Sequence, residues 1–145
     1  AWLENLDDVK QLAKEKATGF LYSSNFSIGV NLFFELNKKL SQLMQNQSEY
    51  KVSIKEIHHA EKLDMPSGTA LSLQSQISNT INIVSERTNN VPGTHIVNYD
   101  SEIDSICITH QAHNRQGFAL GALIAAEWII DKKGCFSMSD ILKIS

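Results

Sequence analysis

The chain has 145 residues, of which 42% are hydrophobic and 20% charged, a composition typical of one globular domain with a sizeable core. A formal net charge of −3 and a pI near 5.9 provide no basic surface for nucleic acid, so we expect no nucleic-acid partner. The longest apolar run, residues 118–130, is interrupted by Glu127 and is too short to cross a bilayer of about 30 Å. With no signal-peptide pattern either, we expect no membrane partner.

The two cysteines, Cys107 and Cys135, stand far apart and have neither CxxC nor histidine spacing. Neither a disulfide framework nor a structural zinc site is indicated. We therefore expect two buried thiols and a cytoplasmic protein.

The first elements predicted are a helix over residues 6–16 and a short apolar strand over 19–22. One helix and one strand cannot form a nucleotide-binding sheet, and no GxGxxG motif is present. A polar crossover then leads into a helix over residues 28–44. Its apolar positions recur at helical spacing and predict a core-facing stripe of Val30, Leu32, Phe33, Leu36, Leu40 and Leu43. Asn25 and Phe26, just before this helix, fit either a helix cap with its hydrophobic staple or part of a site.

The chemistry of the chain is concentrated between residues 56 and 70. Residues 50–57 alternate as a strand does, so His58 and His59 stand at a strand end. Pro66, Ser67 and Gly68 break the backbone, and a helix is expected to begin at Ser67 or Thr69 and to run over residues 70–83. Free amides at Gly68 and Thr69, together with the helix dipole, predict a site for a carboxylate or phosphate.

Lys62 follows His58 by four positions, so the intervening loop can turn its ammonium group toward the same anion. His58 and His59 can exchange a proton near neutral pH. The alternative is that these histidines are ordinary surface or hydrogen-bonded residues.

The remaining chain predicts a turn-rich connector over 87–93, a hairpin of strands 94–99 and 103–110, a helix over 118–131 and a short helix starting at Ser137. Arg115 is expected to cap the penultimate helix or to pair near it. The five histidines lack a helical pair with a carboxylate, and no acidic ligand stands at a matching interval, so we expect no metal.

Residues 58–70 read His-His-x-x-Lys-x-Asp-x-Pro-Ser-Gly-Thr-Ala, which resembles the substrate signature of dihydrodipicolinate reductase. These are nicotinamide-dependent oxidoreductases of diaminopimelate and lysine biosynthesis. Residues 24–31, 109–122 and 136–142 resemble the same family in the same order. The resemblance implies an α+β fold, a mixed or antiparallel sheet covered by helices on one face, with remnants of a Rossmann domain at both termini.

By the same resemblance, residues 1–23 are a remnant of the dinucleotide-binding domain, 24–133 a substrate-binding and oligomerisation domain, and 134–145 a return to the first domain. The family's first half is not in the sequence, so we expect a truncated chain that is inactive by itself. A homotetramer is implied, although the 87–95 connector is shorter than in many members, which leaves the assembly open.

The activity implied is reduction of 4-hydroxy-tetrahydrodipicolinate to tetrahydrodipicolinate with NADH or NADPH and loss of water. The resemblance assigns catalysis to His58 and Lys62. It further assigns substrate binding to His59, Ser67, Gly68 and Thr69, and contact with the cofactor to Ser23, Ser24, Asn25 and Phe26. Two alternatives stay open: a non-catalytic module that binds a small dicarboxylate or serves assembly, and a related oxidoreductase acting on another amino or hydroxy acid.

Overall fold

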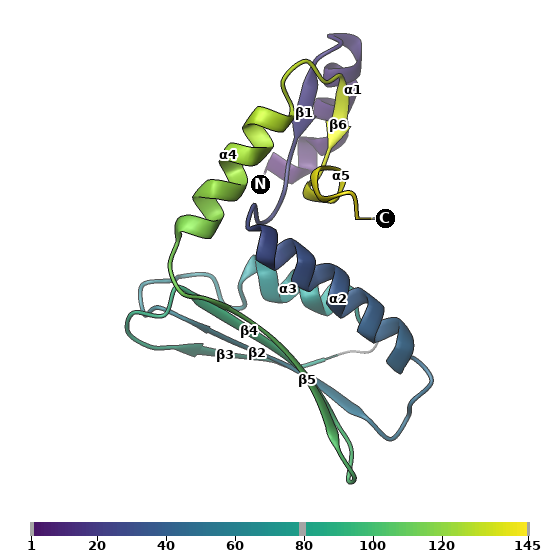
Figure 1. Ribbon diagram of the computed structural model, residues 1–145, viewed down its shortest axis with the longest axis vertical. Helices are drawn as coiled ribbons and strands as arrows, with labels where there is room; N and C mark the ends of the chain where they lie inside the picture. The colour runs from purple at the N-terminus through teal and green to yellow at the C-terminus, as the bar shows by residue number, and fades with distance from the viewer. Residues whose placement is uncertain (1, 79–80, 145) are drawn as a thin grey trace.

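The computed structural model describes residues 2–78 and 81–144 (Figure 1). Its main body is a four-stranded sheet in the order β3-β2-β4-β5, with helices α2 and α3 on one face. Strands β2 and β3 are parallel, and the other two pairings are antiparallel, so the sheet is mixed and the α+β class is confirmed. The bounds are α2 (Ile28–Met44), β2 (Lys51–His58), α3 (Gly68–Ser75), β3 (Ile83–Arg87), β4 (Gly93–Asp100) and β5 (Ser105–Ala112).

Helix α2 begins where predicted, with the Ser27 hydroxyl as its N-cap accepting from the Val30 amide. Its buried face packs Val30 and Phe33 against sheet residues that include Ile54 and Val97. The predicted stripe is partly wrong, because the side chains of Leu32, Leu36 and Leu43 are at least half exposed. The face toward the sheet is instead completed by Phe34, with Leu40 partly buried beside it.

The alternation of β2 buries Ile54, Glu56 and His58 on the face covered by the helices. In β4, His95 and Val97 occupy the same covered layer, and Glu56 pairs in register with His95. The apolar core therefore gives way to a buried polar cluster at one end of the sheet.

The segment after α3 differs from the predicted helix over residues 70–83. Helix α3 ends at Ser75, and strand β3 begins at Ile83; the predicted helix also crosses residues 79–80, which lie outside the described residues. Tertiary hydrogen bonds accompany the early end: the Asn37 amide donates to the Leu73 carbonyl, and the Gln74 amide donates to the Ile81 carbonyl. Arg87 consequently ends a strand instead of lying in a turn.

The expectation of buried thiols is wrong, since both cysteines are exposed. Cys107 belongs to the edge strand β5, whose residues Ile108 and His110 face the helices, so Cys107 points to the uncovered side. Cys135 lies in the short strand β6 (Gly134–Phe136), which the sequence did not predict.

A smaller unit contains both ends of the chain. Strands β1 (Gly19–Leu21) and β6 pair in parallel, next to α1 (Leu6–Glu15), the 3-10 helix η1 (Trp2–Asn5) and α5 (Met138–Leu142). Ser137 and Asp140 form a capping box at α5, as expected for a short helix beginning there. Among the described helices, none combines the length and apolarity needed to span a membrane.

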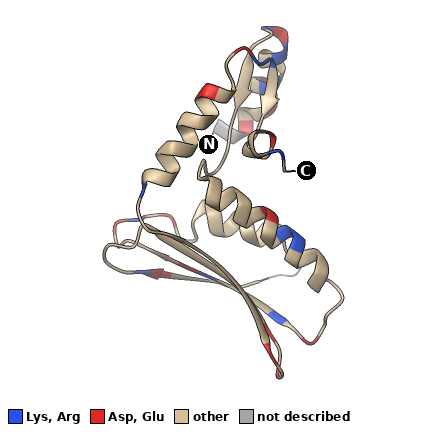
Figure 2. Ribbon diagram, in the orientation of Figure 1, with Lys and Arg blue, Asp and Glu red and all other residues tan. Residues whose placement is uncertain are grey.

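Helix α4 (Gln116–Trp128) connects the end of β5 to this smaller unit (Figure 1). Along its length Glu127 is the one charged residue (Figure 2). The backbone of the 23–27 linker crosses α4 at Gly121, where an added Cβ would lie 1.8 Å from the Phe26 carbonyl oxygen. Only a residue without a side chain permits this approach.

We therefore expect Gly121→Ala to lower the free energy of unfolding by about 1–3 kcal/mol, because the linker backbone must move. Gly117→Ala is the matched control in the same helix, since its Cβ would meet only the Ser27 hydroxyl at 3.8 Å. This control should be neutral or stabilising, by up to about 1 kcal/mol. Urea denaturation of both variants measures the difference, and equal effects would contradict the close crossing.

Candidate active site

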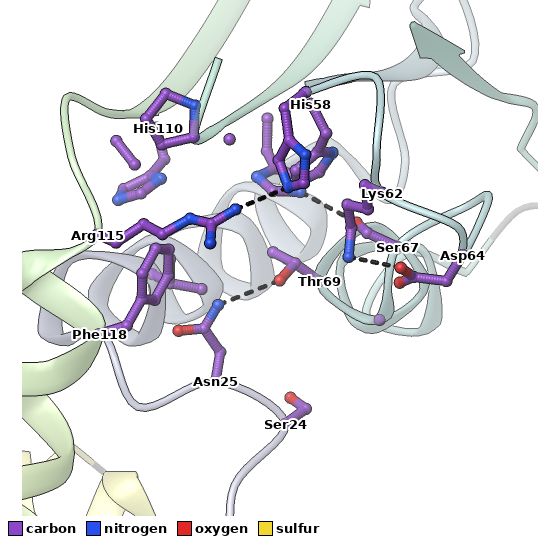
Figure 3. A pocket seen from close by; sticks show the side chains of 17 residues that line it. Ser24, Asn25, His58, Lys62, Asp64, Ser67, Thr69, His110, Arg115 and Phe118 are labelled. Atoms are coloured by element: carbon purple, nitrogen blue, oxygen red, sulfur yellow. Dashed lines mark hydrogen bonds and ion pairs between the residues drawn. The ribbon is translucent and has the colours of Figure 1, made fainter. Parts of the chain in front are cut away.

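A cavity of about 370 Å³ opens at the polar end of the four-stranded sheet (Figure 3). Its walls come from the end of β2 and the loop that follows it, the beginning of β4, the end of β5, the starts of α3 and α4, and the 23–27 linker. Of the residues singled out in the sequence, it is lined by Ser24, Asn25, His58, His59, Lys62, Ser67, Gly68 and Thr69. Ser23 and Phe26 do not belong to this lining.

The start of α3 forms one wall of the cavity. Ser67 is the N-cap, and its hydroxyl accepts from the Ala70 amide at 3.2 Å. The preceding amide, that of Ser67, donates to Glu56, whereas Gly68 and Thr69 line the cavity. A Cβ on Gly68 would meet no atom within 4 Å, so a ligand has room to approach this backbone.

Lys62 lies in the nine-residue connection between β2 and α3, residues 59–67, which we call the Lys62 loop. Its ammonium group donates to Asp64 at 2.6 Å, and both side chains line the cavity. This hydrogen bond, aided by the Gly68 amide, lowers the pKa of Asp64. The anion that Lys62 faces here is thus a carboxylate of the protein's own loop.

Asn25 joins the linker to the start of α3. Its Oδ1 accepts from the Ser27 amide at 2.9 Å, which fixes the direction of the side-chain amide, and its Nδ2 donates to the Thr69 hydroxyl at 3.2 Å. The Thr69 oxygen is therefore used as an acceptor, and its proton is available to a ligand. The prediction that Asn25 is the N-cap of this helix is wrong, because Ser27 caps α2.

His58 and His95 lie edge to face near the start of α3, with ring centroids 5.0 Å apart. Burial lowers the pKa of His58, although the nearby Glu56 carboxylate acts in the opposite direction. Burial also lowers the pKa of His95, to about 4, and the His58 ring contributes to the shift. Both imidazoles are neutral near pH 7.

Glu56 is the centre of this cluster and was not identified from the sequence as a site residue. Its carboxylate is fully buried and accepts from the Ser67 amide at 3.1 Å, the Ser85 hydroxyl at 2.7 Å and the Arg87 guanidinium at 3.3 Å. Burial alone would raise its pKa, but the hydrogen bonds from Ser67 and Ser85 outweigh that effect and lower it. The sequence did carry a signal for Glu56, because an acidic residue stands at a position where the alternation of the strand predicts burial.

We expected no acidic ligand at a matching interval from the histidines. This expectation is wrong, because Glu56, His58 and His95 bring ligand atoms within 4.8 Å of one another. These residue types can bind Zn²⁺. However, both Glu56 oxygens already accept hydrogen bonds, and the Arg87 guanidinium places a positive charge beside them. The absence of a bound metal stays a prediction.

Arg115 precedes α4 but makes no side-chain cap hydrogen bond. Its guanidinium lies 2.9 Å from the His59 ring nitrogen, so it pairs with the Lys62 loop, and both residues line the cavity. The contact connects β5–α4 to β2–α3, which are distant in sequence.

Comparison with known proteins gives a consistent result. The family model "Dihydrodipicolinate reductase, C-terminus" matches residues 29–142. The 4-hydroxy-tetrahydrodipicolinate reductase of Christiangramia forsetii is 48% identical, covering 97% of this chain and 66% of its own length. The enzyme of the same name from Thermosipho africanus is 40% identical, covering 88% of this chain and 58% of its own.

Among solved structures, a dipicolinate-bound dihydrodipicolinate reductase from Paenisporosarcina sp. TG-14 has the same fold, with a TM-score of 0.69 at 24% identity, covering 92% of this chain and 58% of that one. The chain spans between about half and two thirds of the length of the relatives it matches. The chain belongs to the dihydrodipicolinate reductase family, of which it contains the C-terminal region.

Proposed function

We propose that the protein reduces 4-hydroxy-tetrahydrodipicolinate to tetrahydrodipicolinate with NADH or NADPH, and that this chain supplies the substrate site. The observation that supports this is that one cavity is lined by Lys62, by His58 and by Gly68 and Thr69 at the N-terminus of α3. The relatives that carry the family name, and a structural neighbour described as dipicolinate-bound, agree with a small dicarboxylate as the ligand.

One substrate carboxylate would bind at the Gly68 and Thr69 amides, with the hydroxyls of Ser67 and Thr69 beside them. Lys62 would exchange its Asp64 partner for this carboxylate, which costs little because one ion pair replaces another. His59 adds a donor, and its Arg115 neighbour suits the second carboxylate. Ionic hydrogen bonds of this kind are about twice as strong as neutral ones.

Hydride addition to the dehydrated ring leaves negative charge that takes up one proton, and we assign its delivery to Lys62. His58 is neutral near pH 7, so it can accept a proton during loss of water and return it. NADH or NADPH would supply the hydride when bound. Ser24 and Asn25 line the cavity and would face the cofactor, with Ser23 and Phe26 shaping the linker around them.

For the rest of the chain, we propose that residues 1–23 and 134–145 belong to the dinucleotide-binding domain and residues 24–133 to the substrate domain. The parallel pairing of β1 with β6 supports one unit formed from both ends. The sheet face opposite α2 and α3 is uncovered and exposes Val84 and Cys107, which supports a homo-oligomer, a tetramer by family resemblance (Figure 1). Two exposed free thiols fit a reducing cytoplasm.

A second candidate is a module that binds a dicarboxylate without catalysing a reaction. It is supported by the position of the cavity, whose lining runs only from Ser24 to Phe118 and needs no nucleotide-binding segment. A related oxidoreductase acting on another amino or hydroxy acid would show itself in substrate assays.

Pyridine-2,6-dicarboxylate should bind the chain, and Lys62→Ala should weaken binding about 10- to 100-fold, because an ionic hydrogen bond of roughly 1.5–3 kcal/mol is lost. Isothermal titration calorimetry measures both affinities. Lys38→Ala removes an equal charge from α2 away from the cavity and is the control. Equal affinity of the Lys62 variant and the wild type would contradict the carboxylate site.

Catalysis can be tested by fusing this chain to the part of the Christiangramia forsetii relative that the match does not cover; the two proteins are 48% identical over the shared region. The chimera should oxidise NADH or NADPH in the presence of 4-hydroxy-tetrahydrodipicolinate. His58→Ala should lower kcat about 10²- to 10⁴-fold, the usual contribution of general acid–base catalysis. His113→Ala, at an exposed histidine outside the cavity, should leave kcat unchanged; a normal kcat in His58→Ala would refute the role.

A further inference from the structure

We propose that Glu56 is the positioning residue of the carboxylate site: its buried carboxylate holds Arg87 and the Ser67 amide, and through them fixes the Lys62 loop against the start of α3. This inference rests on the proposed function and deepens it by naming the group that sets the geometry of the site. Glu56 itself does not line the cavity.

Three segments of the chain meet at Glu56. The Ser67 amide, at the end of the Lys62 loop, donates to both carboxylate oxygens at 3.1 Å. Ser85 and Arg87 come from β3, which pairs with β2 so that Ser85 stands beside Glu56. One carboxylate therefore joins β2, β3 and the residue that caps α3.

Arg87 holds the backbone of the Lys62 loop by two hydrogen bonds. Its Nε donates to the Lys62 carbonyl at 3.2 Å, and a terminal nitrogen donates to the Asp64 carbonyl at 2.6 Å. Its side chain is only 12% exposed, and Glu56 is its carboxylate partner among the described ion pairs. Without that partner the guanidinium would be a buried, unpaired charge, and its hold on the loop backbone would be lost.

His58 lies beside the same carboxylate. Its Nδ1 lies 3.4 Å from Glu56, outside hydrogen-bond geometry but close enough to favour a proton on that nitrogen. A neutral ring protonated at Nδ1 has its lone pair on Nε2. The charged and titratable groups that act on His58 are Glu56, Lys62, Arg87 and Asp64, with the His95 ring packed on it.

A purely structural role for Glu56 is the competing explanation, and Ile54→Val separates the two. Ile54 lies two residues before Glu56 on the same strand and the same buried face, so this variant loosens the core without changing a charge or a loop contact. Glu56→Gln keeps the shape but removes the charge, and its amide group would face donors that need an acceptor.

The experiment is nuclear magnetic resonance of the 145-residue chain and its variants, with titration of the His58 ring and of pyridine-2,6-dicarboxylate. Glu56→Gln should lower the pKa of His58, since the carboxylate that favours the imidazolium is gone, and should weaken dicarboxylate binding about tenfold or more. Ile54→Val should change neither quantity. Unchanged binding and an unchanged His58 titration in Glu56→Gln would overturn the proposal.

Arg87→Lys provides a second measurement should Glu56→Gln not fold. It keeps a positive partner for Glu56 but cannot reach two loop carbonyls at once, so it should weaken binding while leaving the His58 titration near that of the wild type. Wild-type affinity in Arg87→Lys would overturn the proposal. If the wild-type chain does not bind the dicarboxylate, the proposed function fails. The amide resonances of the Lys62 loop and the His58 titration then still decide the role of Glu56.

Discussion

The buried charge of Glu56 is the constraint on which the arrangement of the site depends. A carboxylate without exposure to solvent is tolerated only when its oxygens accept good hydrogen bonds and a counter-ion is near. Here the donors are an amide, a hydroxyl and a guanidinium from two other segments. Displacement of those segments would leave the charge uncompensated, so the positions of the Lys62 loop and of β3 are tied to Glu56.

The topology explains why these groups meet. Strand β2, helix α3 and strand β3 form a β-α-β unit, so the two parallel strands end at the same edge of the sheet, with His58 opposite Arg87. The N-terminus of α3 lies at that edge as well. Carboxyl ends of parallel strands and helix N-termini are where α/β structures commonly bind anionic ligands. The antiparallel strand β4 then adds His95 from the other side.

The sequence predicted the parts of the site that are local along the chain. Residues 58–70 carry their own turn, cap and charged group, so their placement around one cavity could be expected from spacing alone. Contacts that depend on strand pairing could not be expected from spacing. Glu56 and Arg87 come together only because β3 lies beside β2. The error over residues 70–83, where a continuous helix was predicted, also hid the strand that carries Arg87.

Two other errors have the same origin. Leu32, Leu36 and Leu43 have helical periodicity, but periodicity does not say which side of a helix the sheet covers, and α2 leaves these leucines exposed. Cys107 belongs to a strand with the predicted alternation, but the helices cover only one face of β5, and Cys107 points to the other face. Hydrophobic spacing thus identified α2 and β5, whereas the burial of their side chains depended on contacts between elements.

The linker adds one further consequence for the site. Asn25 donates to Thr69 at the start of α3, and the backbone of the next residue, Phe26, lies close against Gly121 of α4, which has no side chain. The linker therefore contacts both the start of α3 and the helix that leads to the unit containing β1 and β6.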